Sequence, residues 1–423
     1  MKHIEQIKSY IEKNKKSYTN LLQQMVQEPS KAGNESGIQQ LIADRLEESG
    51  FEVDKWKLDY ELLSEHEYFC ASRSDFAGSE NVVGVLKGSG TGKSIILNGH
   101  VDVVPEGDLD QWIDDPFSGK VIDDKLYGRG STDMKGGNLS ALLAVEAIQR
   151  SGIKLKGDVI FQSVVEEESG GSGTLAAIER GYRADAALIP EPTNMRIFPK
   201  QQGSMWFKVH VYGKSAHGGT RYEGVSAIEK SMIVHDAILE LEKQRNNSLT
   251  DPLFKNNPIP IPINIGKING GNWPSSVADH VILEGRMGIA PGESPKDASQ
   301  SLEDHLAGLP KTDEWFANAS VEVEWFGARW LPGEIDEKHP LMKTLYESHF
   351  DVTGEKPLVE ASPWGTDGGL LSQLAGVPVV VYGPGVTNMA HYPNEYIELE
   401  KIFETALIIA KTLISWCEIE EEQ

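Results

Sequence analysis

The chain has 423 residues, more than one ordinary hydrophobic core supports, so two domains are expected. It is 39% hydrophobic and 25% charged, as soluble globular proteins are. The formal net charge of -24 argues against a nucleic-acid partner, because phosphate backbones repel acidic surfaces. Cys70 and Cys417 lie far apart and outside any metal-ligand spacing, which argues against a disulfide framework and fits a reducing cytoplasm. Residues 1–16 contain no signal-peptide core, and no apolar run is long enough to cross a bilayer, so no membrane partner is expected.

The first 200 residues alternate between predicted helices and strands. Apolar spacing predicts helices over residues 7–26, 38–46, 139–148 and from 175 onwards. Short apolar runs predict strands at 51–58, 81–87, 94–98, 159–165 and 186–189, with polar loops at 64–79 and 107–119. Short β-branched strands between helices indicate a mainly parallel or mixed sheet covered on both faces.

The pattern changes near residue 205. Strands are predicted at 205–212, 261–268, 277–288 and 319–325, and helices at 225–241 and 295–306. This β-α-β-β-α-β order is that of a ferredoxin-like unit. Helices at 341–350, 370–374 and 399–414 and a strand at 377–382 then complete the first domain. The predicted fold is therefore α/β, with one domain from residues 1–200 and 327–423 and an inserted ferredoxin-like α+β domain at 201–326.

A histidine and an aspartate end one of the buried strands. His100 and Asp102 follow the apolar run 95–98 and precede Pro105. An extended backbone places residues two apart on the same side, so the carboxylate can hold the imidazole as it does beside metal-binding histidines. The pair predicts a metal at the end of this strand, although alone it also fits a structural hydrogen bond.

Acidic residues follow other predicted strands and loops. Asp133 lies in a glycine-rich loop that lacks the dinucleotide and Walker patterns, and a carboxylate there would repel phosphate and suits a cation. Residues 166–168 are three glutamates directly after the strand 159–165, where the alternative is a solvated acidic turn. Prolines flank Glu191 and stiffen its backbone, as ligand positioning requires. His391 follows a strand and a Gly-Pro-Gly turn.

Ligands of α/β sheets collect outside the carboxyl ends of the strands, where these residues are expected. Two imidazoles and three carboxylates suit zinc, cobalt or manganese rather than calcium. Because five ligands exceed the usual three of a mononuclear catalytic zinc, two metals about 3.5–4 Å apart and sharing one carboxylate are expected. The five candidate ligands are His100, Asp133, Glu168, Glu191 and His391.

These residues lie in motifs that resemble the M20 metallopeptidases, in particular the acetylornithine deacetylase and succinyl-diaminopimelate desuccinylase group. The motifs are GHVDVVP at 99–105, GRGSTDMKG at 128–136, EEESG at 166–170, EPT at 191–193, KSAHG at 214–218 and the segment around His391. They span nearly the whole chain.

The resemblance implies a zinc-peptidase-like catalytic domain and a dimerisation role for the insert. It implies that His100, Asp133 and Glu191 hold one metal, that Asp133, Glu168 and His391 hold the other, and that Asp102 orients His100. It also implies that Glu167 is the general base. The family commonly has Asp-Glu-Glu where this chain has three glutamates, so Glu166 is the alternative base.

The resemblance also assigns residues in the insert. His217 matches a histidine that crosses a dimer interface and stabilises the oxyanion in the neighbouring site, a role suited to a donor placed where charge develops. Arg286 matches an arginine that binds a substrate carboxylate, for which a guanidinium is well shaped. Asn272 is a candidate substrate contact, although Gly271-Asn272-Trp273-Pro274 departs from the family's spacing. Asp367 is expected to be structural.

The resulting hypothesis is a cytoplasmic, homodimeric amidohydrolase with two zinc ions, or cobalt or manganese, that removes an acyl group from an N-acyl amino acid or related amine. Acetyl is the first choice, with succinyl and formyl as possibilities. The alternatives are a dipeptidase or carboxypeptidase, a deformylase of an amino-heterocycle, a phosphate-ester hydrolase using the same metals, and a metabolite-binding protein without turnover.

Overall fold

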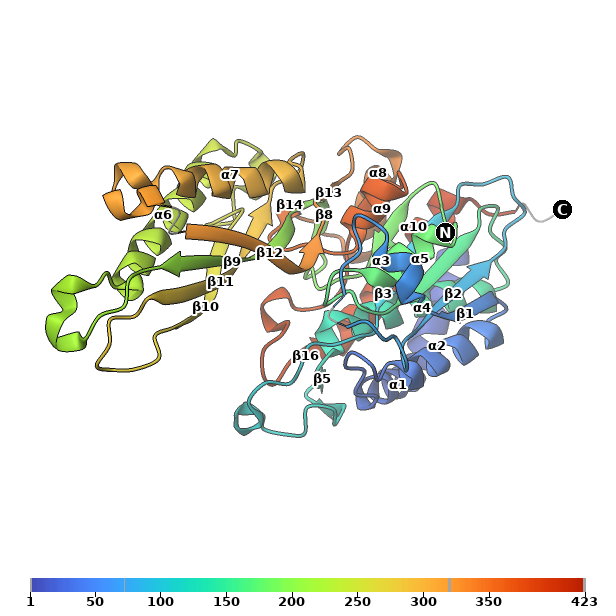
Figure 1. The fold of residues 1–423 in the computed structure, drawn as a ribbon. Coiled ribbons are helices and arrows are strands. Elements are labelled where there is room, and N and C mark those ends of the chain that lie inside the picture. The colour runs from blue at the N-terminus through green and yellow to red at the C-terminus, as the bar shows by residue number, and fades with distance from the viewer. Residues whose placement is uncertain (1, 72, 319–320, 421–423) are drawn as a thin grey trace. The chain divides into compact units, whose positions relative to one another are not determined.

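The computed structural model describes residues 2–71, 73–318 and 321–420. The chain forms two compact units, both drawn in Figure 1. The first consists of Met1–Lys200, Glu334–Glu360 and Asp367–Gln423, and the second of Gln201–Gly333 and Ala361–Thr366. The second unit runs to Gly333 rather than to residue 326, because its last strand is longer than predicted. A register shift between Phe326 and Arg329 lets that strand continue.

A nine-stranded sheet forms the centre of the first unit, in the order β1-β2-β6-β3-β7-β15-β8-β13, with β14 paired to β8. Strands β6, β3, β7 and β15 are parallel, whereas β1, β2 and β8 join antiparallel. Every residue of β3 and β6 is buried, so both faces are covered. The predicted mixed sheet is confirmed. The strands are β1 (Glu52–Lys57), β2 (Glu80–Leu86), β3 (Ile95–His100), β6 (Val159–Val164), β7 (Ala187–Ile189), β8 (Ile197–Gln201), β13 (Gly333–Glu334), β14 (Val359–Ser362) and β15 (Val379–Val381).

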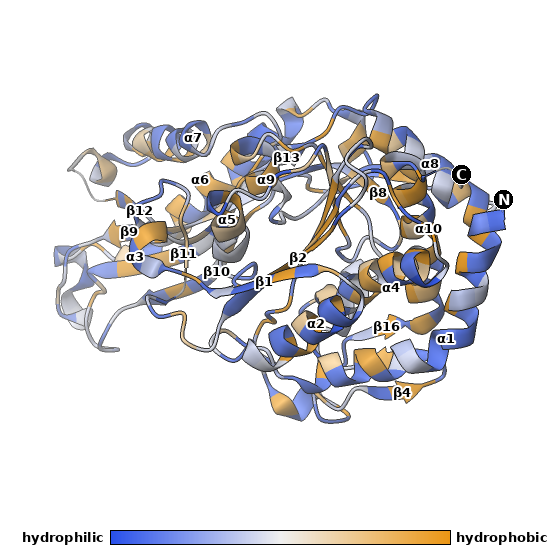
Figure 2. Ribbon diagram, turned by 90° about the vertical axis from the view of Figure 1, so that its right-hand side faces the viewer, coloured by the Kyte–Doolittle hydropathy of each residue, from blue (hydrophilic) through white to orange (hydrophobic). Residues whose placement is uncertain are grey.

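Helices cover this sheet. The helices are α1 (Lys2–Gln27), α2 (Ser36–Glu48), α3 (Tyr60–Ser64), α4 (Gly136–Arg150), α5 (Ser172–Glu179), α8 (Pro340–Thr353), α9 (Gly368–Leu374) and α10 (Leu399–Cys417). Helix α10 packs on α1, α4 and α8, while α5 packs on α9 and on β2 and β6. Helix α1 is amphipathic, burying Ile7, Ile11 and Leu22, whereas α4 is buried from Gly136 to Ile148 and is therefore central. In Figure 2 the ribbon of α1 is a mixture of blue and orange, as expected of an amphipathic helix.

A small three-stranded sheet in the first unit was not predicted. It comprises β4 (Lys120–Ile122), β5 (Lys125–Tyr127) and β16 (Tyr396–Glu398) in the order β16-β5-β4. Its strands are too short to show a periodic pattern, and β16 finds its partner far along the chain, with Tyr396 opposite Tyr127. This pairing brings the glycine-rich loop that follows β5 beside the segment that carries His391. The short elements α3, β8, β13 and β14 were also not predicted.

The second unit has the predicted ferredoxin-like order. Its elements are β9 (Gly203–Tyr212), α6 (Ala227–Ser248), β10 (Ile263–Gly270), β11 (His280–Ile289), α7 (Pro295–Ala307) and β12 (Val321–Trp330), with sheet order β10-β11-β9-β12. Residues 319 and 320 of the predicted last strand lie outside the described residues. Alternate residues of β9, such as Phe207 and Val209, enter a core shared with α6 and α7, which lie along the sheet in Figure 1. Among the residues that the structure describes, no helix combines the length and apolarity needed to span a bilayer.

Candidate metal centre

His100 is the last residue of β3 and is 1% exposed. Its Nδ1 lies 2.8 Å from the main-chain oxygen of Asp102. A carbonyl oxygen only accepts, so Nδ1 carries a proton and Nε2 is the ring nitrogen left to bind a metal. Glycine at position 99 allows a close approach to α4, because a Cβ there would lie 1.9 Å from Oδ1 of Asn138. Strand β3 therefore ends close against α4, with the His100 imidazole directed by local backbone.

Asp102, predicted to orient His100, contacts that imidazole more closely through its main chain than through its carboxylate. Its Oδ1 lies 3.6 Å from Nδ1 of His100, farther than the main-chain oxygen of the same residue. The carboxylate accepts hydrogen bonds from the backbone N–H groups of Glu167 (3.3 Å) and Glu168 (3.1 Å) instead. The chain leaves the β3 ladder after His100, so strict strand alternation no longer applies to Asp102. Asp102 thus joins the end of β3 to the turn after β6.

Asp133 lies between two imidazoles. Its Oδ1 is 3.3 Å from Nε2 of His100, and its Oδ2 is 3.2 Å from Nε2 of His391. Glu191 extends the site on one side, with Oε1 3.6 Å from Nε2 of His100. Glu168 extends it on the other, with Oε1 3.2 Å from Nε2 of His391. The structure thus brings together all five residues predicted as ligands, and donor atoms of His100, Asp133 and Glu168 lie within 4.8 Å of one another.

Strand ends position most of these side chains. His100, Glu168 and Glu191 follow the parallel strands β3, β6 and β7, whose carboxyl ends meet at one edge. Asp133 lies in the predicted glycine-rich loop, in the turn Ser131–Lys135 that follows β5 of the small sheet. The sequence permits close packing here, since a Cβ on Gly137 would lie 1.8 Å from the Pro190 oxygen.

The site concentrates negative charge away from water. Burial raises the pKa of Glu167 and of Glu191 well above the usual carboxyl value. Burial alone would also raise the pKa of Asp133, but hydrogen bonds to His100 and His391 lower it below its usual value. The charge of Glu168 raises the pKa of His391 to about 11, against the effect of burial. Four acidic side chains around two imidazoles fit bound cations, which would neutralise the excess negative charge.

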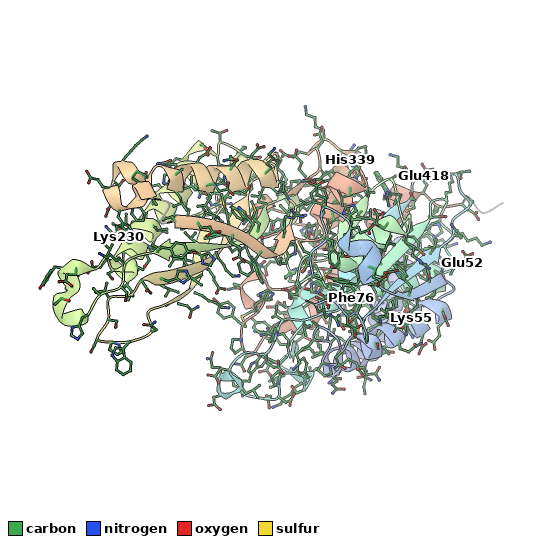
Figure 3. The ribbon with its side chains drawn as sticks, viewed as in Figure 1. Glu52, Lys55, Phe76, Lys230, His339 and Glu418 are labelled. Carbon is green, nitrogen blue, oxygen red and sulfur yellow. The ribbon has the colours of Figure 1, made fainter. Side chains whose placement is uncertain are left out.

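The three consecutive glutamates point to different partners. Glu166 has a positive φ of 63°, and its Oε1 accepts a hydrogen bond of 2.6 Å from Nε of Arg73. The Arg73 guanidinium also lies over the ring of Phe76, 5.4 Å from its centroid, and Figure 3 labels Phe76 within the first unit. Glu166 is therefore engaged with Arg73, whereas Glu168 contacts His391. Glu167, at 6% exposure, has its backbone held by Asp102.

The remaining predicted residues belong to the second unit. His217 is exposed, and its Nδ1 accepts a hydrogen bond of 3.0 Å from the N–H of Gly219. The side chain of Arg286 on β11 makes no hydrogen bond or ion pair with any described residue, and burial lowers its pKa to about 10. Asn272 is exposed in the loop between β10 and β11.

Sequence reasoning missed two residues beside the site, Arg129 and Glu395. They form a buried ion pair of 2.7 Å that contacts the segments carrying Asp133 and His391. The only signals were an arginine inside the glycine-rich loop and a glutamate four residues after His391. Asp367, expected to be structural, is buried and accepts a hydrogen bond of 2.7 Å from Thr174.

Residues 96–415 match the model of peptidase family M20/M25/M40, and the chain belongs to this family. It is therefore a metal-dependent hydrolase related to deacylases and peptidases that act on amide bonds. It is 35% identical over 93% of its length to N-formyl-4-amino-5-aminomethyl-2-methylpyrimidine deformylase of Bacillus subtilis, covering 92% of that protein. It is 30% identical over 80% of its length to acetylornithine deacetylase of Salmonella heidelberg, covering 85% of that protein. The fold is similar to that of the dipeptidase Dug1p of Saccharomyces cerevisiae, with a TM-score of 0.76, 17% identity and full coverage of both chains.

Proposed function

We propose that the chain is a dinuclear metal-dependent amidohydrolase that removes a small acyl group from an amine. The observation that carries this proposal is the position of Asp133, whose two carboxylate oxygens face the Nε2 atoms of His100 and His391. A carboxylate so placed is suited to bridge two cations. In this proposal His100, Asp133 and Glu191 hold one cation, and Asp133, Glu168 and His391 hold the other.

Zinc fits this mixed set of nitrogen and oxygen donors, and cobalt and manganese also fit. Two such cations, when bound, would acidify a water molecule and polarise the substrate carbonyl. The protonated Nδ1 of His100, held by the main-chain oxygen of Asp102, leaves Nε2 directed at the site.

Glu167 is the proposed general base. It accepts a proton from the attacking water and delivers it to the leaving amine. The engagement of Glu166 with Arg73 supports Glu167 over the alternative base. The hydrogen bond from the backbone N–H of Glu167 to the Asp102 carboxylate would keep the residue in place while its side chain exchanges a proton.

His217 is proposed to stabilise the oxyanion. Because Nδ1 accepts from Gly219, the neutral ring carries its proton on Nε2, which makes no hydrogen bond with any described residue. That atom is available as a donor where negative charge develops. We propose that it acts in the site of a second copy of the chain.

A homodimer through the second unit supports that role. Helix α6 exposes Ile228, Met232 and Leu239, at 49%, 47% and 43%, in one apolar stripe at helical spacing. Light scattering tests the dimer. A dimeric mass that falls to the monomer in Met232→Asp supports it, whereas a monomeric wild type with full activity contradicts it. The thiol state of Cys70 and Cys417, which form no disulfide with a described residue, fits a cytoplasmic location.

The acyl group proposed first is formyl, on an aminomethylpyrimidine. The support is the 35% identity over nearly the whole chain to the Bacillus subtilis deformylase, against 30% over a smaller part for the acetylornithine deacetylase. The second candidate is an N-acyl amino acid, favoured by Arg286, a guanidinium without a described partner that suits a substrate carboxylate. Asn272 is a further candidate contact for either substrate.

Hydrolysis assays distinguish these substrates. Zinc- or cobalt-loaded protein is given N-formyl-4-amino-5-aminomethyl-2-methylpyrimidine, N-acetylornithine, an N-succinyl amino acid and dipeptides at equal concentration. The proposal predicts the highest kcat/KM for the formyl compound. A higher value for an acyl amino acid would favour the second candidate, and cleavage of dipeptides alone would contradict both.

A further inference from the structure

Arg129 and Glu395 form a fully enclosed ion pair in the first unit. Their side chains are 2% and 0% exposed, and Nη1 of Arg129 lies 2.7 Å from Oε2 of Glu395. Neither side chain belongs to the proposed ligand set. Burying two charges is costly unless their hydrogen bonds are well satisfied, so the groups that satisfy them are informative.

Glu395 binds the main chain of the loop that carries Asp133. Its Oε2 accepts from the N–H of Gly130 at 3.1 Å, and its Oε1 accepts from the N–H groups of Thr132 at 2.9 Å and of Asp133 at 3.2 Å. Three donors of an irregular turn are thus fixed by one carboxylate. The backbone N–H of Asp133 therefore donates directly to the side chain of Glu395, which lies 262 residues further along the chain.

Arg129 binds the main chain of the segment that carries His391. Its Nη2 donates to the oxygen of His391 at 3.2 Å and to that of Pro105 at 3.4 Å, and its Nη1 donates to the oxygen of Tyr392 at 3.3 Å. The guanidinium also lies 5.3 Å from the ring centroid of Trp112. The segments that follow His100 and contain His391 are therefore fastened to the same ion pair.

Other ligands have separate support. His100 ends β3 and pairs with Val164 of β6 in the large sheet, and Glu191 lies two residues after the end of β7. Asp133 and His391 lie in turns, and the His391 side chain is 52% exposed. Their 3.2 Å approach depends on whatever joins the two turns.

We propose that the Arg129–Glu395 pair is a positioning device that sets the spacing of Asp133 and His391 before a cation binds, and so sets the affinity of the site made by Asp133, Glu168 and His391. This inference rests on the proposed dinuclear site. Residues that orient metal ligands typically contribute 10- to 100-fold in metal affinity. The site made by His100, Asp133 and Glu191 depends less on the pair, because His100 belongs to the large sheet and Glu191 follows one of its strands by two residues.

Metal titration tests the proposal. Metal-free wild type, Glu395→Gln and Arg129→Lys are titrated with Zn²⁺ against a chromophoric chelator, and with Co²⁺ while its visible absorption is recorded. Glu146→Gln is the matched control, because Glu146 is 1% exposed and lies 2.7 Å from Nε of Arg45 in a partly buried pair between α4 and α2. Thermal unfolding of the metal-free proteins measures the loss of stability in each.

We expect Glu395→Gln and Arg129→Lys to bind the second cation about 10- to 100-fold more weakly while the first changes by less than about threefold. The Co²⁺ spectrum should change only over the second equivalent. Glu146→Gln should lower the Tm and leave both affinities unchanged. Wild-type affinities in both pair variants would overturn the proposal. It would also be overturned if the pair variants and Glu146→Gln, at the same loss of Tm, weakened both metal sites equally. If wild type itself binds fewer than two cations, the dinuclear function fails instead.

Discussion

The backbone N–H of Glu167 donates a hydrogen bond to Oδ1 of Asp102 across 3.3 Å. The same carboxylate accepts from Glu168, while the main-chain oxygen of Asp102 lies 2.8 Å from the imidazole of His100. Asp102 thus contacts a metal-ligand candidate through its backbone and the proposed base through its side chain. Burial raises the pKa of Asp102 to about 8, and the neighbouring His100 opposes this rise.

Replacing Asp102 tests that connection. Asp102→Asn exchanges one acceptor oxygen for an amide that cannot accept from Glu168 or Glu167, so the turn should shift and kcat should fall about 10- to 100-fold. The control is Asp158→Asn, whose carboxylate also accepts a backbone N–H, from Gly88, but at the start of β6. Steady-state kinetics should show normal kcat in the control. Equal losses in both variants would mean that only the stability of β6 is involved.

The identity of the base is tested by adjacent substitutions. Glu167→Gln should lower kcat by about 10²- to 10⁴-fold without loss of metal, because the amide cannot transfer the proton. Glu166→Gln loses charge pairing with Arg73 and should have a much smaller effect. Kinetics are measured with metal content determined on the same samples. An inactive Glu166→Gln beside an active Glu167→Gln would reverse the assignment.

Donation by His217 across a dimer predicts complementation. His217→Ala and Glu167→Gln should each be inactive, yet a dimer of one of each contains one site with both residues intact. Random mixing after subunit exchange should restore about a quarter of wild-type activity, since half of the dimers are mixed and each has one complete site. Mixtures that remain inactive although mass spectrometry shows mixed dimers would place His217 outside the reaction.

Arg286 should separate the two substrate classes. Arg286→Met removes the guanidinium and should lower kcat/KM about 10- to 100-fold for N-acetyl amino acids, which lose a charge-assisted hydrogen bond. The formyl-aminomethylpyrimidine has no carboxylate and should be affected by less than about threefold. The same large loss for both substrates would indicate that Arg286 supports the fold of β11 and does not bind the substrate carboxylate.

Cation binding to the metal-free protein should release protons. The pKa of His391 is raised to about 11, and that of His100 lies well above its usual value, so both imidazoles are protonated near neutral pH. A metal needs the neutral ring, so affinity should rise with pH from neutral towards the His391 pKa of about 11. Calorimetry in two buffers of different ionisation enthalpy measures the protons released. A heat of binding independent of the buffer would contradict the charged state of these histidines.

The sequence was sufficient for features that depend on local pattern. Alternation along β9 and helical spacing in α6 and α7 revealed the ferredoxin-like unit, and residues after apolar strands revealed His100, Glu168 and Glu191. Each of these depends on a few neighbouring residues, so one chain is enough to detect them.

Other features depend on contacts between distant segments. Strands β5 and β16 have three residues each and are stable only as partners, so neither carries its own signal. Arg129 and Glu395 are 266 residues apart, and the sequence around each residue does not predict its partner. The backbone torsions after β3 decide whether the main chain or the carboxylate of Asp102 lies closer to His100. Strand alternation in the sequence does not predict those torsions.

The most direct test of the dinuclear mechanism is to titrate metal-free protein with Zn²⁺ and measure hydrolysis and bound metal in each sample, with Asp133→Ala treated alike. The substrate is the compound with the highest kcat/KM among the formyl, acetyl, succinyl and dipeptide substrates. We predict no turnover without metal, activity that reaches its maximum at two bound equivalents, and none in Asp133→Ala. Equal activity in the metal-free protein or in Asp133→Ala, or no hydrolysis of any substrate with two cations bound, would contradict it.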